Sequence, residues 1–164
     1  MILIGLGGNL PGAAGGPEVT CAAALAQLEE AGVQILARSP WYQTAPVPIS
    51  DQPWFINGVV QVAASLTPVK LLALMHDVEA AMGRVRTIAN AARAVDLDLL
   101  AYEGVVLAGP EAPILPHPRL QDRAFVLFPL RDIAPQWRHP VTRETPDEMI
   151  ARMPPGQEIR LLKP

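Results

Sequence analysis

The sequence contains a single cysteine, Cys21, so no disulfide bond can form within the chain. It also lacks any apolar run near the roughly 20 residues of a membrane-spanning helix. The chain opens directly on the apolar run 1–5, with no basic leader or cleavage site. These absences favour a reducing compartment. We therefore expect a cytoplasmic protein with no membrane partner, in which Cys21 is a small packing side chain.

The sequence also lacks an excess of positive charge, because 13 Lys and Arg residues stand against 16 Asp and Glu residues. This balance does not fit the basic surface of a nucleic-acid-binding protein, and we expect no such partner. A bound phosphate group would have to be held by local arginines or by metal ions. The length of 164 residues fits one domain, 1–164, with its own core.

Several common catalytic and nucleotide-binding motifs are missing. The glycine-rich segment 5–10 lacks the last glycine of a dinucleotide-binding fingerprint, and no Gly-Lys-Ser/Thr P-loop occurs. There is also no Gly-x-Ser-x-Gly nucleophile elbow and no zinc-type set of Cys and His. Any nucleotide must be bound by a different arrangement of side chains.

Apolar patterning and turn residues predict alternating strands and helices. The expected strands are 1–6, 33–42, 55–65 and 95–102, and the expected helices are 20–30 and 68–82. The second helix has the clearest limits, with Thr67 as its cap and Gly83 at its end. The order β-α-β-β-α-β predicts an α+β fold of the ferredoxin-like type.

Beyond this unit, we expect extra C-terminal elements. A proline-rich stretch leads to a short helix after Leu120, which Pro129 should limit. The tail from Pro135 onward is expected to be irregular, with a short helix at 146–152.

The most informative local feature is the pair Asp96 and Asp98 in the strand 95–102. Alternate side chains of a strand share a face, so both carboxylates should point the same way. Close carboxylates repel each other unless a cation or a proton lies between them. Mg²⁺ prefers such oxygen ligands together with substrate phosphates. The alternative is a solvated face of an edge strand.

Basic residues flank this pair on both sides. Arg84, Arg86 and Arg93 precede it, and arginine suits phosphate oxygens. His117 lies between two prolines, where it is positioned to donate to a phosphate together with Arg123. The alternatives are that the three arginines only solvate a loop and that His117 is a structural residue.

An aromatic and an amide side chain share a face of the strand 55–65. Phe55 can stack on a flat heterocycle, and the amide of Asn57 can read its donor and acceptor edge. Core packing of Phe55 and a turn at Asn57 are the alternatives.

Taken in order, these segments resemble one family, the 6-hydroxymethyl-7,8-dihydropterin pyrophosphokinases of folate biosynthesis. The resemblance runs from Gly5 to about Pro135. Its most specific motifs are Gly-Arg-Val-Arg at 83–86, Arg-Ala-Val-Asp-Leu-Asp at 93–98 and Pro-His-Pro-Arg-Leu at 116–120. The segments 42–46, 52–57 and 123–125 also fit the family pattern.

The resemblance implies an Mg-ATP-dependent transferase that moves pyrophosphate from ATP to the pterin and releases AMP. It implies two Mg²⁺ ions on Asp96 and Asp98, and catalytic roles for Arg84 and Arg93. It assigns the ATP site to His76, Glu79, Arg84, Arg86, His117 and Arg123. It assigns the pterin site to Thr44, Val47, Phe55, Asn57 and Phe125. The expected partners are these two small molecules, and the expected state is a monomer.

The sequence departs from the family pattern in two places. The first loop reads Gly7-Gly8-Asn9 where the family has Gly-Ser-Asn. The segment 89–92 reads Ala-Asn-Ala-Ala, where the family has a tryptophan and Gly-Pro before the arginine at Arg93. The second departure lies in a loop expected to close over the substrates, and lids often limit turnover. A catalytically weak or non-catalytic relative that binds pterin or nucleotide is therefore the alternative function.

Overall fold

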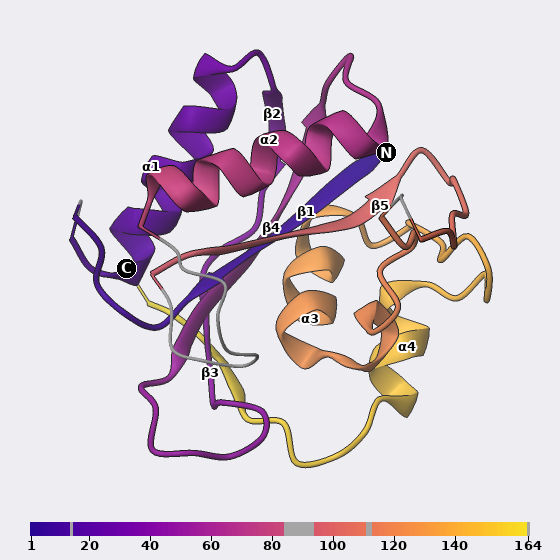
Figure 1. The fold of residues 1–164 in the computed structure, drawn as a ribbon. Helices are drawn as coiled ribbons and strands as arrows, with labels where there is room; N and C mark the ends of the chain where they lie inside the picture. The colour runs from indigo at the N-terminus through magenta and orange to yellow at the C-terminus, as the bar shows by residue number, and fades with distance from the viewer. Residues whose placement is uncertain (14, 84–93, 111–112, 164) are drawn as a thin grey trace.

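A computed structural model describes residues 1–13, 15–83, 94–110 and 113–163. A six-stranded sheet forms the centre of the fold (Figure 1). Its strands are β1 (Ile2–Gly8), β2 (Gln34–Arg38), β3 (Tyr42–Thr44), β4 (Phe55–Ala63), β5 (Asp96–Tyr102) and β6 (Ile159–Leu161). The helices are α1 (Pro17–Glu30), α2 (Pro68–Ala81), α3 (Ala124–Ile133) and α4 (Pro146–Arg152), with a short 3-10 turn at Leu120–Asp122.

The strand order is β5-β1-β4-β3-β6, with β2 also paired to β4, and every one of these pairs is antiparallel. The two βαβ units therefore interlock, which places β1 and β5 side by side although 87 residues separate their ends. The predicted ferredoxin-like α+β fold is confirmed.

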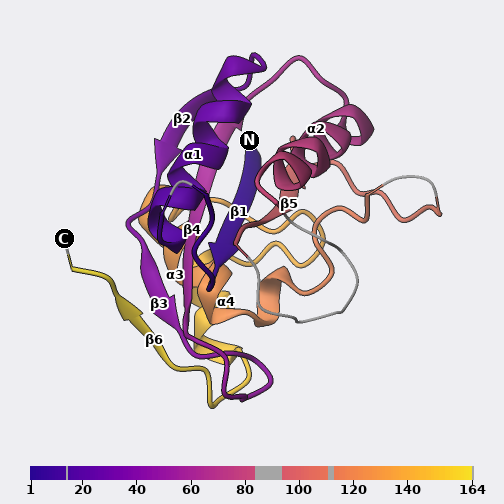
Figure 2. The same cartoon turned by 60° about the vertical axis from the view of Figure 1, so that its left-hand side comes forward.

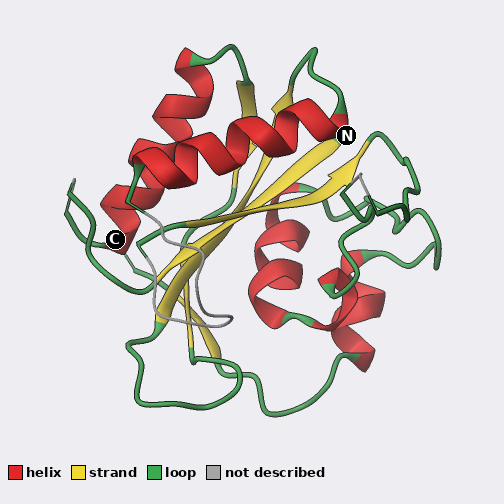
Figure 3. Cartoon of the chain, in the orientation of Figure 1, coloured by secondary structure: helices red, strands yellow, loops and turns green. Residues whose placement is uncertain are grey.

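The helices form a layer on each face of the sheet (Figures 2 and 3). Successive residues of β1 point to opposite faces, because side chains alternate along a strand. Ile2 and Ile4 belong to one apolar core, which also contains Leu25 of α1 and Met75 of α2. Leu3 belongs to a second core that contains side chains of α3 and α4. Cys21 is fully buried in the first core, as expected, and burial raises its pKa to about 12.

Three sequence predictions about elements were inexact or wrong. The expected strand 33–42 is two strands, because Pro40 has no N–H for a sheet hydrogen bond. Pro129 does not limit its helix, since it is a buried residue inside α3. There the burial of the neighbouring Leu127 and Leu130 outweighs the hydrogen bond that proline cannot make. The strand β6 was not predicted, whereas the helix at Pro146–Arg152 is confirmed.

His139 organises the turn between α3 and α4. Its Nδ1 accepts the backbone N–H groups of Val141 and Thr142, at 3.2 Å each, and its side chain is buried. Burial lowers the pKa of His139 from its ordinary value of 6.5, and the nearby Glu144 carboxylate only partly opposes this. No helix in the described part of the chain is long and apolar enough to cross a membrane.

We predict that His139 makes the protein less stable in acid. Its pKa is lower in the folded chain than in the unfolded chain, so the unfolded chain takes up the proton first. The stabilisation is complete above about pH 6.5 and is lost as the pH falls below that value. The free energy of unfolding in urea should fall less between about pH 7.5 and about pH 5 for His139→Asn than for the wild type. Equal losses would contradict this role.

Candidate functional site

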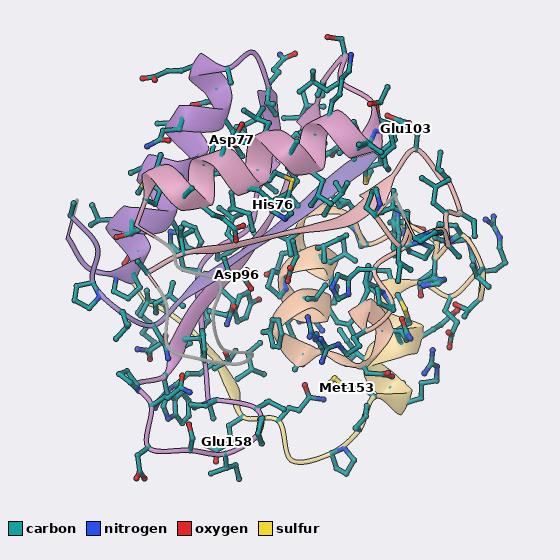
Figure 4. All side chains as sticks on the ribbon, in the orientation of Figure 1. His76, Asp77, Asp96, Glu103, Met153 and Glu158 are labelled. Carbon is teal, nitrogen blue, oxygen red and sulfur yellow. The ribbon has the colours of Figure 1, made fainter. Side chains whose placement is uncertain are left out.

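Asp96 and Asp98 lie on β5, at the edge of the sheet. Both are half-buried, whereas Leu97 between them is buried in the first core. The period-2 prediction for this strand is therefore correct, and the two carboxylates share a face. In the register with β1, Asp96 lies opposite Gly7 and Asp98 lies opposite Gly5, so no β1 side chain crowds them. Figure 4 shows Asp96 on β5.

Glu79 of α2 supports this carboxylate pair from the helix layer. Its side chain is only 1% exposed, and its Oε2 accepts the backbone N–H of Leu97 at 2.9 Å. This bond fixes the peptide between Asp96 and Leu97. His76 lies one turn earlier on the same helix and is exposed (Figure 4).

His117 and Arg123 lie next to Asp98. The backbone N–H of His117 donates to the carbonyl of Leu100 at 2.9 Å, which holds the proline-rich segment against the end of β5. The Nη1 atom of Arg123 lies 3.8 Å from Oδ2 of Asp98. Burial lowers the pKa of His117 and of Arg123, and the Asp98 carboxylate opposes both shifts. The structure thus gathers one carboxylate and two basic side chains from separate segments.

Phe125 follows at the start of α3. The guanidinium carbon of Arg123 lies 5.2 Å from the centroid of the Phe125 ring, a cation–π distance. The Arg123 side chain therefore lies between the Asp98 carboxylate and the half-buried Phe125 ring. The cluster extends from β5 to the other helix layer.

A buried amide and hydroxyl lie nearby at the ends of β3 and β4. The Nδ2 of Asn57 donates to Oγ1 of Thr44 at 2.6 Å, and both side chains are buried. Thr44 pairs with Phe55 in the sheet, and Asn57 pairs with Gly7 of β1. Val47, in the loop that follows, is 57% exposed. Four of the five residues predicted to bind the pterin are thus on or beside adjacent strand ends.

Asn9 is a residue whose contacts the sequence did not predict. Its Nδ2 donates to Oε1 of Gln52 and to the carbonyl of Pro53, at 3.0 Å each. These bonds connect the glycine-rich loop after β1 to the loop before β4. The Gly-Gly-Asn motif marked this loop, but only the fold reveals its partner 43 residues away.

Arg84, Arg86 and Arg93 lie outside the described residues. Within residues 1–13, 15–83, 94–110 and 113–163, no cluster of three or more His, Cys, Asp and Glu side chains is arranged to hold a metal ion.

The chain is similar in sequence to proteins of one known family. A sequence model of the family described as 7,8-dihydro-6-hydroxymethylpterin-pyrophosphokinase (HPPK) matches residues 3–135. The 2-amino-4-hydroxy-6-hydroxymethyldihydropteridine pyrophosphokinase of Methylorubrum extorquens is 39% identical over 93% of both chains. The Bacillus subtilis protein of the same name is 36% identical over 92% of this chain and 87% of its own length.

Other relatives are much longer than this chain. The folic acid synthesis protein fol1 of Schizosaccharomyces pombe is 39% identical over 79% of this chain, which spans 18% of that protein. A Plasmodium falciparum HPPK-DHPS crystal structure superposes on 92% of this chain and 42% of its own, with a TM-score of 0.71 and 15% identity. That likeness supports the fold alone. The family match and the full-length bacterial relatives show that the chain belongs to the 7,8-dihydro-6-hydroxymethylpterin-pyrophosphokinase family.

Proposed function

We propose that this protein transfers the pyrophosphoryl group of ATP to 6-hydroxymethyl-7,8-dihydropterin in folate biosynthesis. The observation that carries this proposal is the half-buried pair Asp96 and Asp98, with Arg123 3.8 Å from Asp98. Two carboxylates and a guanidinium on one face suit a substrate that brings both phosphates and metal ions.

The reaction replaces one bond at the β-phosphorus by another and releases a proton. The hydroxyl oxygen of the pterin attacks the β-phosphorus of ATP, and the bond from that phosphorus to the α,β-bridging oxygen breaks. AMP leaves with the bridging oxygen, and the hydroxyl proton is released. Catalysis of such a transfer depends mainly on positioning and on stabilisation of developing negative charge.

Asp96 and Asp98 fit the chemistry of Mg²⁺, because they are hard oxygen ligands on one face with Glu79 fixing the peptide between them. Two bound Mg²⁺ ions would neutralise phosphate charge and polarise the phosphorus–oxygen bonds. Asp96 and Asp98 would hold these ions, while Arg123 supplies a positive charge 3.8 Å from Asp98.

The nucleotide site would use the side chains around the carboxylate pair. We assign ATP contacts to His76, Glu79, His117 and Arg123, together with Arg84 and Arg86, and catalytic roles to Arg84 and Arg93. In the folded chain, His117 accepts the N–H of Arg119 through Nδ1 at 3.2 Å. Its other ring nitrogen is therefore the donor available to a phosphate oxygen.

The pterin site would use Phe55 and Phe125 as ring faces, with Asn57, Thr44 and the backbone near Val47 along the edge of the heterocycle. The hydrogen bond from Asn57 to Thr44 fixes the amide orientation, so its Oδ1 faces β1 rather than Thr44. An amide that is already fixed can accept a hydrogen bond from the amino group of a pterin without the entropic cost of ordering its side chain.

Product analysis tests the proposed function. Purified protein is mixed with Mg-ATP and 6-hydroxymethyl-7,8-dihydropterin, and the nucleotides are separated by ion-exchange chromatography, with a reaction lacking pterin as the control. AMP that appears only with the pterin supports the transfer. ADP, or no nucleotide product, would refute it. The alternative of a non-catalytic relative depends on the segment 89–92, which lies outside the described residues.

We predict that Gly7→Ala selectively weakens pterin binding. A Cβ at this position would lie 2.5 Å from Oδ1 of Asn57, so the amide would have to move. We expect the KM for the pterin to rise on the order of tenfold, as for the loss of one buried hydrogen bond. The control is Gly16→Ala, at an extended backbone position where an added Cβ would meet no atom within 4 Å. Equal KM values for the two variants would contradict the assignment of Asn57.

The cytoplasmic location and the monomeric state expected from the sequence remain predictions. We propose that the protein is a cytoplasmic monomer and that its partners are the two small-molecule substrates.

A further inference from the structure

The last strand brings the C-terminal tail back to the candidate site, although the family match ends at residue 135. Gln157 makes the central contacts of this tail. Its Oε1 accepts the backbone N–H of Ala124 at 2.9 Å, and its Nε2 donates to the carbonyl of Asp122 at 2.9 Å. One side-chain amide thus binds the backbone on both sides of Arg123.

Those contacts replace a helix cap that α3 lacks. Arg123 is the N-terminal cap residue of α3, and its side chain makes no capping hydrogen bond. The first N–H groups of a helix have no partner inside the helix. Gln157 satisfies the one on Ala124 from 33 residues away. A third bond, from Nε2 to the carbonyl of Pro154 at 3.0 Å, holds the Gln157 amide in place.

The residues after Gln157 fix the opposite side of the site. The carbonyl of Glu158 accepts the N–H of Ala45 at 3.2 Å, and Ile159 pairs with Thr44 in the sheet. The guanidinium of Arg160 lies 4.3 Å from the ring centroid of Trp54, next to Phe55. Four consecutive tail residues therefore contact both the Arg123 side and the Thr44 side of the site.

We propose that Gln157 is a positioning residue for pyrophosphoryl transfer, because it sets the backbone on both sides of Arg123. This inference rests on the proposed function. Arg123 must keep its guanidinium between the Asp98 carboxylate and the Phe125 ring, at 3.8 Å and 5.2 Å. A rotation of either peptide beside Arg123 would move the guanidinium away from both, and small displacements of catalytic groups have large effects on rate.

The test is a double-mutant cycle with Gln157→Leu, which keeps the approximate shape of the side chain and removes its hydrogen bonds. We expect kcat/KM for the pterin to fall about tenfold in the otherwise wild-type protein. In an Arg123→Ala background, the same change should cost less than about threefold, since its effect acts through Arg123. Gln157→Glu keeps an acceptor for the Ala124 N–H and should recover part of the activity.

Gln121→Leu is the matched control, because Gln121 donates a single local hydrogen bond to the carbonyl of Pro118 at 3.0 Å. It should change kcat/KM less than about twofold. Wild-type activity in Gln157→Leu would overturn the inference. An equal fall in kcat/KM with Arg123 present and with Arg123→Ala would also overturn it, because it would indicate a purely structural role.

Failure of the proposed function itself would be visible separately, as a wild-type protein that releases no AMP. Pterin affinity is then measured in the presence of an unreactive α,β-methylene analogue of ATP. Weaker pterin binding by Gln157→Leu than by Gln121→Leu would still support the positioning role, and equal binding would overturn it.

Discussion

Asp98→Asn should lower the magnesium-dependent turnover by at least about a thousandfold, while the protein stays folded. A metal ion contributes several kcal/mol to the stabilisation of a phosphoryl-transfer transition state, and each 1.4 kcal/mol is about a factor of ten in rate. The change keeps the side-chain size but removes the charge that both a metal ion and Arg123 require. The measurement is kcat for AMP formation across a magnesium titration, with circular dichroism as the check on folding.

Asp77→Asn provides the matched control for charge. Asp77 is an exposed aspartate on α2, away from the carboxylate face of β5 (Figure 4). Its loss changes the net charge of the protein by the same amount, so it should leave turnover within about twofold of the wild type. Equal turnover by Asp98→Asn and Asp77→Asn would refute the metal-site assignment. Asp96→Asn should behave like Asp98→Asn.

Glu79→Ala should lower both stability and activity. The Glu79 carboxylate is buried and accepts the N–H of Leu97. Removing it leaves a buried donor without that acceptor, which costs about 1–3 kcal/mol in the free energy of unfolding. Because Leu97 lies between the two aspartates, we also expect kcat/KM to fall about 10- to 100-fold, as for other groups that orient metal ligands.

Glu79→Gln separates the two effects of Glu79. The glutamine keeps an acceptor oxygen for Leu97 but removes the negative charge, so unfolding in urea should stay within about 1 kcal/mol of the wild type. A large loss of turnover in this stable variant would show that the charge itself acts in the reaction. A Glu79→Ala variant with wild-type stability and kcat/KM would contradict the supporting role.

The sequence predicts those parts of the site that depend on local periodicity. Asp96 and Asp98 share a face because strand side chains alternate, and the structure confirms that pattern. The fold class is likewise confirmed, because strand and helix signals occur in an order that few topologies accommodate. The extent of α2 could be predicted from its Thr67 cap and its first-turn proline.

Contacts between distant segments were beyond prediction from periodicity. The bond from Leu97 to Glu79 crosses 18 residues, and the bonds of Gln157 to Asp122 and Ala124 cross 35 and 33. Glutamine has no characteristic pattern in a tail, so nothing in the sequence distinguishes Gln157 from other polar residues. Pro129 shows the opposite failure, in which a strong local rule is overridden by burial in the core around α3.

The position of the cleaved bond in ATP is the most direct test of the proposed function. ATP labelled with ³²P at the β-phosphate is incubated with magnesium, the pterin and the protein, and the products are separated by chromatography. Transfer of pyrophosphate predicts that the label appears in the pterin product and that the AMP is unlabelled. Label that remains in ADP would indicate transfer of the γ-phosphate alone and would contradict the proposed reaction.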